Sequence, residues 1–392
     1  MKLDLGHELE VPTSRDARAR QAFVSQLRGY ILNDLANGMR HSYEKEVAPR
    51  LSQAGKSPKG EDDVHAAMLE NNFFKFYSAI RYNAQEMVWR SVIPDIERNL
   101  EDLAHKIKTL SGKSGGSLTL SPGLAIPENV ADREIHLMPG GYASGDSPLA
   151  GALYDHGLAV FSAGLMGRNL DDIGLSFANY VKFRFPDFEP KHILDCGTTV
   201  GHNAVAWAQT FPRARVDAID VAPSGLLYGH GRAESLGVPV HFRQMDATEL
   251  EYPDRSFDLV FSSMFLHELS VRDIRKYITE AHRVLRPGGL VLTMELPPNL
   301  ELSPYDQFYL DWDCYYNNEP FYRTYRDQNP QDLIVSSGFG VEQYFQFVVP
   351  QFSYMPEPDF AATVGEQRDI GGSTGRLSTG VQWFGFGAWK NR

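Results

Sequence analysis

The feature that most constrains this fold is an alternation of short apolar runs and helical segments, which begins near residue 152. We predict strands at seven of the apolar runs, near 192–196, 215–220, 239–243, 257–262, 288–295, 341–349 and 381–389. Helical segments separate the first six runs, and such alternation is typical of a parallel sheet with helices on both faces. No helix is predicted between the last two runs, so we expect them to pair as an antiparallel hairpin at one edge.

The loop after the first strand reads DCGTTVG and covers residues 195–201. Its glycines, Gly197 and Gly201, do not have the G-x-G-x-x-G spacing of a dinucleotide fingerprint, and a Walker sequence is absent as well. Asp195 also disfavours a phosphate ligand, because like charges repel at close range. The loop is therefore predicted to hold a different kind of ligand.

Two further acids follow the next two strands. Asp220 ends the second strand, where a carboxylate can accept hydrogen bonds from both hydroxyls of a ribose. Asp246 follows the third strand and could accept from the exocyclic amine of an adenine, while the backbone N–H of Ala247 could donate to a ring nitrogen. Acids at the ends of three successive strands outline a crevice, so we expect a ligand that contains adenosine and carries positive charge.

These stretches resemble the class I S-adenosylmethionine-dependent methyltransferases, specifically the small-molecule branch related to the ubiquinone/menaquinone C-methylases. The resemblance covers roughly 150–390 and is carried by ILDCGTTVG, VDAIDVAPSGL, RQMDATELEYPDRSFDLVFSSMFLHEL and EAHRVLRPGGLVLTMELP. It implies an α/β fold, a Rossmann-like seven-stranded methyltransferase sheet with an antiparallel edge hairpin, preceded by a mostly helical N-terminal region. It also implies S-adenosyl-L-methionine as the cofactor and methyl transfer to a small-molecule acceptor by in-line displacement.

The resemblance further implies which residues border the cofactor. They are Asp195, Gly197 and Gly201 for the methionine part and ribose, Asp220 for the ribose, Asp246 and Ala247 for the adenine, and Ser263 for the methionine moiety. The family pattern at the first loop is D-x-G-x-G-x-G, and Thr199 stands in place of the middle glycine. Its Cβ narrows the backbone conformations that this position can adopt.

A histidine is the candidate catalytic residue. The stretch SSMFLHEL follows the fourth strand and places His267 near the methyl-bearing end of the crevice, where some family members have a histidine. Its ordinary pKa near neutrality suits a general base, which is needed only if the acceptor atom carries a proton. A structural role in packing or hydrogen bonding is the alternative. The sequence after His267 does not read H-E-x-x-H, so no metal site is predicted.

The segment 303–325 is dense in aromatic and acidic residues and follows the fifth strand, where the family places substrate-binding insertions. Aromatic faces and carboxylates suit an aromatic or cationic acceptor. The candidate substrate-binding residues are Tyr309, Asp311, Trp312, Asp313 and Tyr316. The alternative is an amphipathic helix that packs on the sheet or on the N-terminal helices, and both can be true.

We divide the chain into three parts. Residues 1–111 are predicted to be a helical region that caps the crevice or forms a homodimer, 112–151 a linker or long ordered loop, and 152–392 the cofactor-binding domain. The last part has insertions at 297–328 and 350–380, and the second insertion is predicted to be a lid or a disordered tip.

Composition narrows the partners and the compartment. The formal net charge of −12 argues against binding to nucleic acid or to an anionic membrane surface. The site after the fourth strand reads SSMF instead of the Asn-Pro-Pro-aromatic motif of nucleobase- and amide-modifying methyltransferases. Two isolated cysteines, no membrane-length apolar run and no apolar leader predict a cytoplasmic protein with reduced thiols.

Three other functions stay open at this point. The same fold can use the bound sulfonium for other chemistry, such as aminopropyl transfer. It can also be a non-catalytic nucleotide-binding scaffold subunit. A hydride-transferring dehydrogenase fits poorly, because the glycine spacing is wrong.

Overall fold

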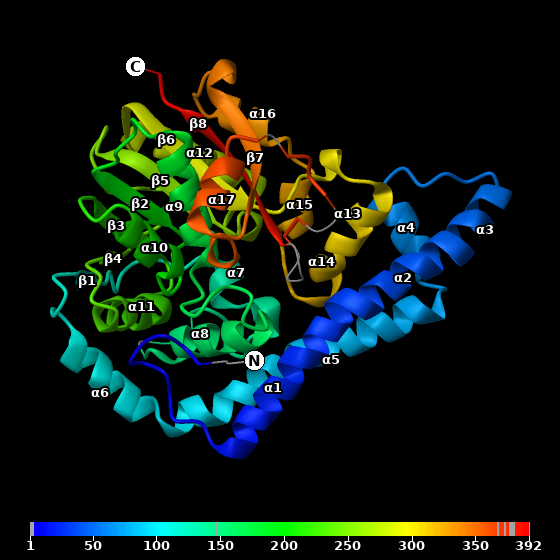
Figure 1. The fold of residues 1–392 in the computed structure, drawn as a ribbon, viewed down its shortest axis with the longest axis horizontal. Coiled ribbons are helices and arrows are strands. Elements are labelled where there is room, and N and C mark those ends of the chain that lie inside the picture. The colour runs from blue at the N-terminus through cyan, green and yellow to red at the C-terminus, as the bar shows by residue number, and fades with distance from the viewer. Residues whose placement is uncertain are drawn as a thin grey trace.

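The computed structural model describes residues 4–143, 145, 147–366, 368–371, 374–375 and 381–391. An eight-stranded sheet in the order β1-β4-β3-β2-β5-β6-β8-β7 forms its centre (Figure 1). The strands are β1 Ser117–Thr119, β2 His192–Cys196, β3 Arg215–Asp220, β4 His241–Gln244, β5 Phe257–Ser263, β6 Leu285–Glu295, β7 Tyr344–Pro350 and β8 Gln382–Trp389. The strands β1 to β6 are parallel to one another, and β8 is antiparallel to both β6 and β7.

The predicted α/β class and all seven predicted strands are confirmed, but the count of seven is wrong. The additional strand β1 comes from the segment 112–151 and pairs with the edge strand β4. With three residues and an exposed surface, it carries too little apolar pattern to be recognised. The antiparallel pair β7–β8 is present, although the short helix α17, Glu357–Thr363, lies between these strands and was not predicted.

Helices cover both faces of the sheet because its central strands are apolar on both sides. In β5, Leu259 and Phe261 contact one hydrophobic cluster and Val260 contacts another, since neighbouring side chains point to opposite faces. The helices of this part are α8 Leu149–Phe161, α9 Asp172–Arg184, α10 His202–Thr210, α11 Pro223–Ser235, α12 Val271–Val284, α15 Tyr322–Arg326 and α16 Pro330–Ser336. The first cluster includes residues of α9 and α10, and the second includes residues of α12 and α16.

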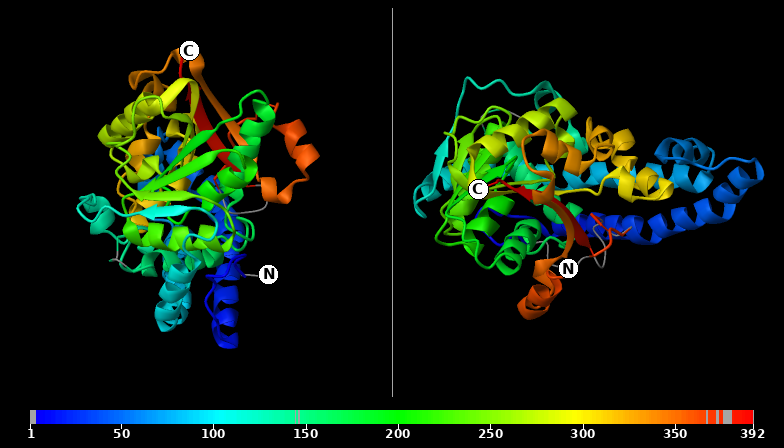
Figure 2. Two further views of the ribbon diagram at one scale, coloured as in Figure 1. Left: turned by 90° about the vertical axis from the view of Figure 1, so that its left-hand side faces the viewer. Right: turned by 90° about the horizontal axis from the view of Figure 1, so that it is seen from above.

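The N-terminal helices form an arm that projects from the sheet, as both figures show (Figures 1 and 2). Its helices are α1 Arg15–Tyr30, α2 Ala36–Ser42, α3 Ala48–Gln53, α4 Glu61–Met68, α5 Asn72–Arg98 and α6 Leu100–Leu110. π-Helical turns at 31–35 and 43–47 join α1, α2 and α3 into one rod, and α5 returns beside it. A short helix, α7 Glu128–Ala131, lies in the connection to the sheet.

The aromatic segment packs against this arm. Its residues form two short helices, α13 Pro304–Leu310 and α14 Trp312–Tyr316. Tyr305, Phe308 and Trp312 are buried in one cluster with apolar side chains of the arm, such as Met68 and Tyr77. The expected helical face is therefore present, and it packs on the N-terminal helices.

The buried carboxylate of Asp155, on α8, joins four parts of the chain. It accepts hydrogen bonds from His7 Nε2 at 2.9 Å, His202 Nε2 at 2.7 Å and the Tyr228 hydroxyl at 2.7 Å. Burial alone would raise the pKa of Asp155, but His7 and His202 hold it well below its usual range. The amide of Leu9 donates to His7 Nδ1, so the proton of His7 is on Nε2 and faces the carboxylate.

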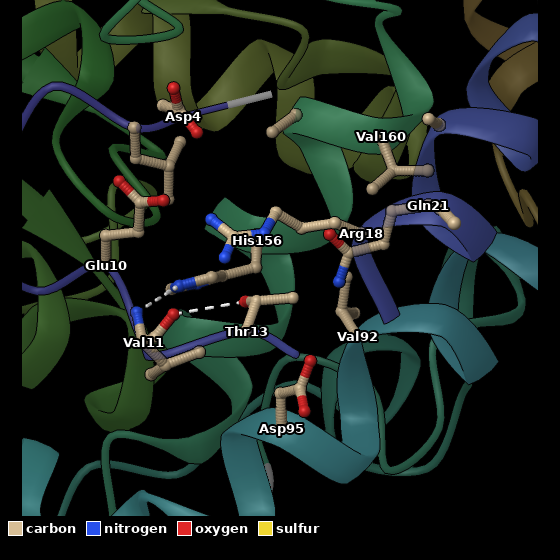
Figure 3. A pocket seen from close by; sticks show the side chains of 14 residues that line it. Asp4, Glu10, Val11, Thr13, Arg18, Gln21, Val92, Asp95, His156 and Val160 are labelled. Carbon is tan, nitrogen blue, oxygen red and sulfur yellow. Dashed lines mark hydrogen bonds between the residues drawn. The ribbon is translucent and has the colours of Figure 1, made fainter. Parts of the chain in front are cut away.

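A cavity of about 350 Å³ lies beside the N-terminal segment (Figure 3). Its wall includes Val11, whose amide donates to His156 Nε2 at 3.2 Å and whose carbonyl accepts from Thr13 Oγ1 at 3.1 Å. His156 Nδ1 donates in turn to the carbonyl of Ala152 on α8. These contacts hold the segment before α1 against α8.

Within the described ranges, the structure contains no helix that is both long and apolar enough to span a membrane.

The Asp155 cluster yields a prediction about stability. Asp155→Ala leaves two histidines, Tyr228 and the nearby Arg232 without their buried acceptor, so the free energy of unfolding should fall by about 3–5 kcal/mol. Chemical denaturation followed by circular dichroism measures this change. Asp187→Ala, at an exposed position, is the control and should change stability by less than about 0.5 kcal/mol. Equal denaturation midpoints for the two variants would contradict the prediction.

Candidate active site

A cavity of about 840 Å³ lies at the carboxyl ends of the parallel strands. Loops after β2, β3, β4 and β5 form its sheet-side crevice, around Gly197, Asp220 and Asp246. Helices α1 and α5 and the segment 123–142 extend it into an arm-side chamber, around Arg28 and Glu268. Pockets for small molecules usually have volumes of roughly 300–1,000 Å³, so this cavity has room for a cofactor and a second molecule.

Most of the residues that the sequence singled out line this cavity: Gly197, Asp220, Asp246, Ala247, Ser263, His267, Tyr309 and Asp313. The described lining does not include Asp195 or Gly201, or the residues Asp311, Trp312 and Tyr316. Asp311 forms a buried ion pair with Arg326, at 2.8 Å between its Oδ1 and Arg326 Nη1. Trp312 donates to Ser78 Oγ of the arm and packs beside Tyr316.

The loop from β2 to α10 keeps a left-handed backbone at three positions. Gly197 and Gly201 have φ angles of +70° and +74°, and Thr199 has a φ of +50°. A Cβ at Gly197 would lie 2.4 Å from a ring atom of Phe265, so only glycine fits there. For a β-branched residue such as Thr199, this conformation costs on the order of 1–3 kcal/mol. Thr199 thus has a left-handed backbone conformation that a glycine would adopt more easily.

Asp220 fixes this loop and also faces the cavity. Its Oδ2 accepts from the amide of Thr199 and its Oδ1 from the amide of Ala222, both at 2.9 Å. Burial raises the pKa of Asp220, and these amide donors lower it. The carboxylate is therefore held in one orientation at the end of β3, with acceptor capacity left for a ligand.

Asp195 stabilises the glycine loop from its buried side. Its side chain is buried and accepts from Thr198 Oγ1 at 2.6 Å. Burial raises the pKa of Asp195 to about 7. On the cavity side, Asp246 Oδ1 accepts from the amide of Thr248 at 2.7 Å, which orients its carboxylate next to Ala247.

His267 and Glu295 form a buried dyad. His267 Nδ1 lies 2.8 Å from Glu295 Oε2, and Glu295 Oε1 accepts from the amides of Phe265 and Leu266. Burial would lower the pKa of His267, but the charge and hydrogen bond of Glu295 raise it to about 10. His267 is therefore an imidazolium at neutral pH, and it must lose a proton before it can act as a base.

A second cluster was not predicted from the sequence. His136 Nδ1 lies 2.7 Å from Glu319 Oε1, and one ligand atom from each of His136, Glu268 and Glu319 lies within 4.8 Å of the other two. Glu268 Oε2 and Glu319 Oε2 are buried and have no partner among the described residues. Burial and the charge of Glu319 raise the pKa of Glu268 to about 7. These three residues could hold a metal ion or an organic cation.

Aromatic rings connect this cluster with the sheet-side crevice. The ring centroids of His136 and Tyr142 are 6.4 Å apart, those of Tyr142 and Tyr154 5.8 Å, and those of Tyr154 and His202 6.0 Å. Burial and then the charge of Glu268 raise the pKa of Tyr142, and Asp220 adds to the effect. The rings of Tyr142 and Tyr154 therefore link His136 of the cluster with His202 of the glycine loop's helix.

Comparisons with known proteins agree with this geometry. Residues 193–289 match the model of the methyltransferase domain family. The chain is 32% identical over 171 residues to the demethylmenaquinone methyltransferase of Thermus thermophilus, which covers 43% of this chain and 70% of that enzyme. It is 35% identical over 103 residues to the ubiquinone/menaquinone biosynthesis C-methyltransferase of Bdellovibrio bacteriovorus, with 26% of this chain and 43% of that enzyme covered.

Among solved structures, an S-adenosylmethionine-dependent methyltransferase of Methanosarcina mazei is 18% identical, with a TM-score of 0.37 and coverage of 52% of this chain and 94% of that chain. The sequence matches place this chain in the class I S-adenosylmethionine-dependent methyltransferases. Its cofactor is S-adenosyl-L-methionine and its reaction is methyl transfer.

The role that the sequence predicts for Asp220, as the carboxylate that holds the ribose, can be tested directly. Asp220→Asn removes the negative charge but keeps the size, so affinity for S-adenosylhomocysteine should fall by about 1.5–3 kcal/mol in calorimetry. The matched control is Asp258→Asn, because Asp258 also accepts two backbone amides, from Lys191 and His192, but at the opposite end of the sheet. Unchanged affinity in a folded Asp220→Asn protein would remove this carboxylate from the cofactor site.

Proposed function

We propose that this enzyme methylates the nitrogen of a small-molecule amine, which enters the arm-side chamber as an ammonium cation. The observation that carries this proposal is the pair of carboxylates at Glu268 and Glu319, each with a buried oxygen that has no partner among the described residues. We further propose that Asp220 holds the ribose of the cofactor and Asp246 with Ala247 its adenine. Gly197 and Ser263 would then border the methionine part.

The charges around the cluster favour a cation. The negative charge of Glu319 is balanced by His136, whose pKa it raises against the effect of burial. His267 is paired with Glu295, so neither of these imidazoles is left to balance Glu268. An unpaired buried carboxylate is destabilising, and a bound ammonium would supply the missing counter-charge.

The aromatic lining of the chamber supports the same class of acceptor. Tyr142, Tyr154, Tyr322 and Trp89 all line the cavity. Faces of such rings attract cations within about 6 Å, and they also exclude water from the reacting groups. An aliphatic or aromatic amine would find both a counter-charge and a ring-lined wall.

The proposed reaction needs one proton acceptor. The ammonium must lose a proton so that its nitrogen lone pair can attack the methyl carbon in line with the carbon–sulfur bond. A carbon–nitrogen bond forms, the carbon–sulfur bond breaks, and the sulfur keeps the electron pair as S-adenosylhomocysteine leaves. The proton goes to Glu268, whose pKa of about 7 suits a base near neutral pH.

The His267–Glu295 dyad favours a second candidate, which is transfer to a hydroxyl oxygen. Glu295 is hydrogen-bonded to Nδ1 of His267, and no described residue forms a hydrogen bond with Nε2 of the same ring. Such an arrangement orients an imidazole to take a proton from a hydroxyl, provided that the ring is neutral. The dyad's high pKa makes this reaction favourable only at alkaline pH.

The test compares acceptors that differ only in the nucleophile, with mass spectrometry of the products. Phenylalanine is paired with phenyllactate, and benzylamine with benzyl alcohol. We expect methylation of the amines, with kcat/KM rising as the pH increases through about 7, because only the deprotonated form of Glu268 accepts the proton. Glu268→Gln should lower kcat/KM about 10²–10⁴-fold without a change in cofactor affinity.

Glu301→Gln is the control for this experiment, because Glu301 is exposed outside the cavity. Methylation of the hydroxyl compounds alone would contradict amine transfer and support the dyad. Amine transfer would also be contradicted if the protein bound Mn²⁺ stoichiometrically and Glu268→Gln abolished this binding. The cluster of His136, Glu268 and Glu319 would then be a metal site.

A further inference from the structure

Two arginines of the arm line the chamber. Arg28, on α1, is only 4% exposed. Its Nε donates to the carbonyl of Phe161 at 3.2 Å, and its Nη1 donates to Gln85 Oε1 at 2.6 Å. Its guanidinium carbon lies 3.9 Å from the centre of the Phe161 ring. All of these partners are neutral, and Arg28 forms no ion pair with a described carboxylate.

Arg81, on α5, is the second of these arginines. Its Nη2 lies 3.2 Å from Asp313 Oδ2, and its guanidinium stacks at 3.9 Å on the Trp312 ring. Its Nη1 is buried and has no partner among the described residues. Asp313 pairs with Arg81 alone, and no other described carboxylate pairs with either guanidinium, so one positive charge is left over.

The two arginines face each other across the arm. Arg28 bonds to Gln85, which is one helical turn after Arg81 on the same face of α5. Burial and then the charge of Arg81 lower the pKa of Arg28 to about 9, which agrees with this proximity. An excess positive charge in a buried wall is destabilising unless an anion joins it.

We propose that Arg28 and Arg81 form an anion-binding subsite, and that the methyl acceptor carries a carboxylate or phosphate group that binds there. Guanidinium groups bind these oxyanions through paired, charge-assisted hydrogen bonds. The free donors on this wall are Arg81 Nη1 and the Nη2 of Arg28, for which no described partner exists.

Hydrogen bonds connect this subsite with the glutamate cluster. Gln85 Nε2 donates to the carbonyl of His136 at 2.9 Å. Asn317 Nδ2 donates to Asp313 Oδ1 at 3.2 Å, and the backbone carbonyl of Asn317 accepts from the amide of His136 at 3.0 Å. The anion subsite and the cation cluster are thus neighbouring parts of one chamber. Together with the proposed amine function, on which this step rests, the subsite predicts a zwitterionic acceptor.

The subsite can be tested without turnover, so its failure is distinguishable from a failure of the amine proposal. Calorimetry with the full chain saturated with S-adenosylhomocysteine would compare phenylacetate, phenyl phosphate and the neutral phenylacetamide. None of these probes carries an amine. We expect one of the two anions to bind at least 10-fold more tightly than phenylacetamide, and the stronger anion identifies the oxyanion.

Arg28→Gln should remove this preference, whereas Arg20→Gln, at an exposed position of the same helix, should retain it. Arg28→Lys keeps the charge but not the planar guanidinium group, so it should retain part of the preference. It is the test variant to use if Arg28→Gln does not fold. Unchanged affinity for S-adenosylhomocysteine shows that a variant is folded. Equal binding of the three probes to the unmodified protein would overturn the proposal, as would a full preference in either Arg28 variant.

Discussion

The buried carboxylate of Asp155 is the interaction on which the relative placement of arm and sheet depends. Its hydrogen-bond donors come from the N-terminal segment, α10 and α11. One of them, His202, is the first residue after the glycine loop and also lines the cavity. Because α8 packs on α1 and α5 as well, the same helix that carries Asp155 positions the arm over the sheet. A buried charge that loses its donors is strongly destabilising, so these parts are held together as a unit.

This placement gives the cavity two electrostatic regions. The sheet places the carboxylates of Asp220 and Asp246 at the cavity, and the insertion after β6 brings Glu319 to His136 and Glu268. The arm supplies the positively charged side chains of Arg28 and Arg81, which line the chamber. In a medium of low dielectric, such separated charges select ligands more strongly than exposed charges do. We therefore propose that the arm determines which acceptor binds, while the sheet binds the methyl donor.

The sequence predicted the sheet and the place of two acids at its edge because both are encoded locally. Asp220 is the last residue of one strand and Asp246 follows the next, so their place at the edge of the sheet could be inferred from strand ends alone. The chamber could not be predicted this way. His136 and Glu319 are far apart in sequence and meet only because the connection to the sheet and the insertion pack together. In the aromatic segment, Tyr309 and Asp313 line the cavity, but helical periodicity cannot separate them from Trp312, which packs on the arm.

The most direct test of this account is a crystal structure of the chain with S-adenosylhomocysteine. We expect the ribose hydroxyls within hydrogen-bond distance of Asp220 and the adenine beside Asp246. The sulfur should face the arm-side chamber, towards Glu268 and Glu319. A ribose bound away from Asp220, or a sulfur that faces away from these glutamates, would contradict the proposed division of the cavity into a donor crevice and an acceptor chamber.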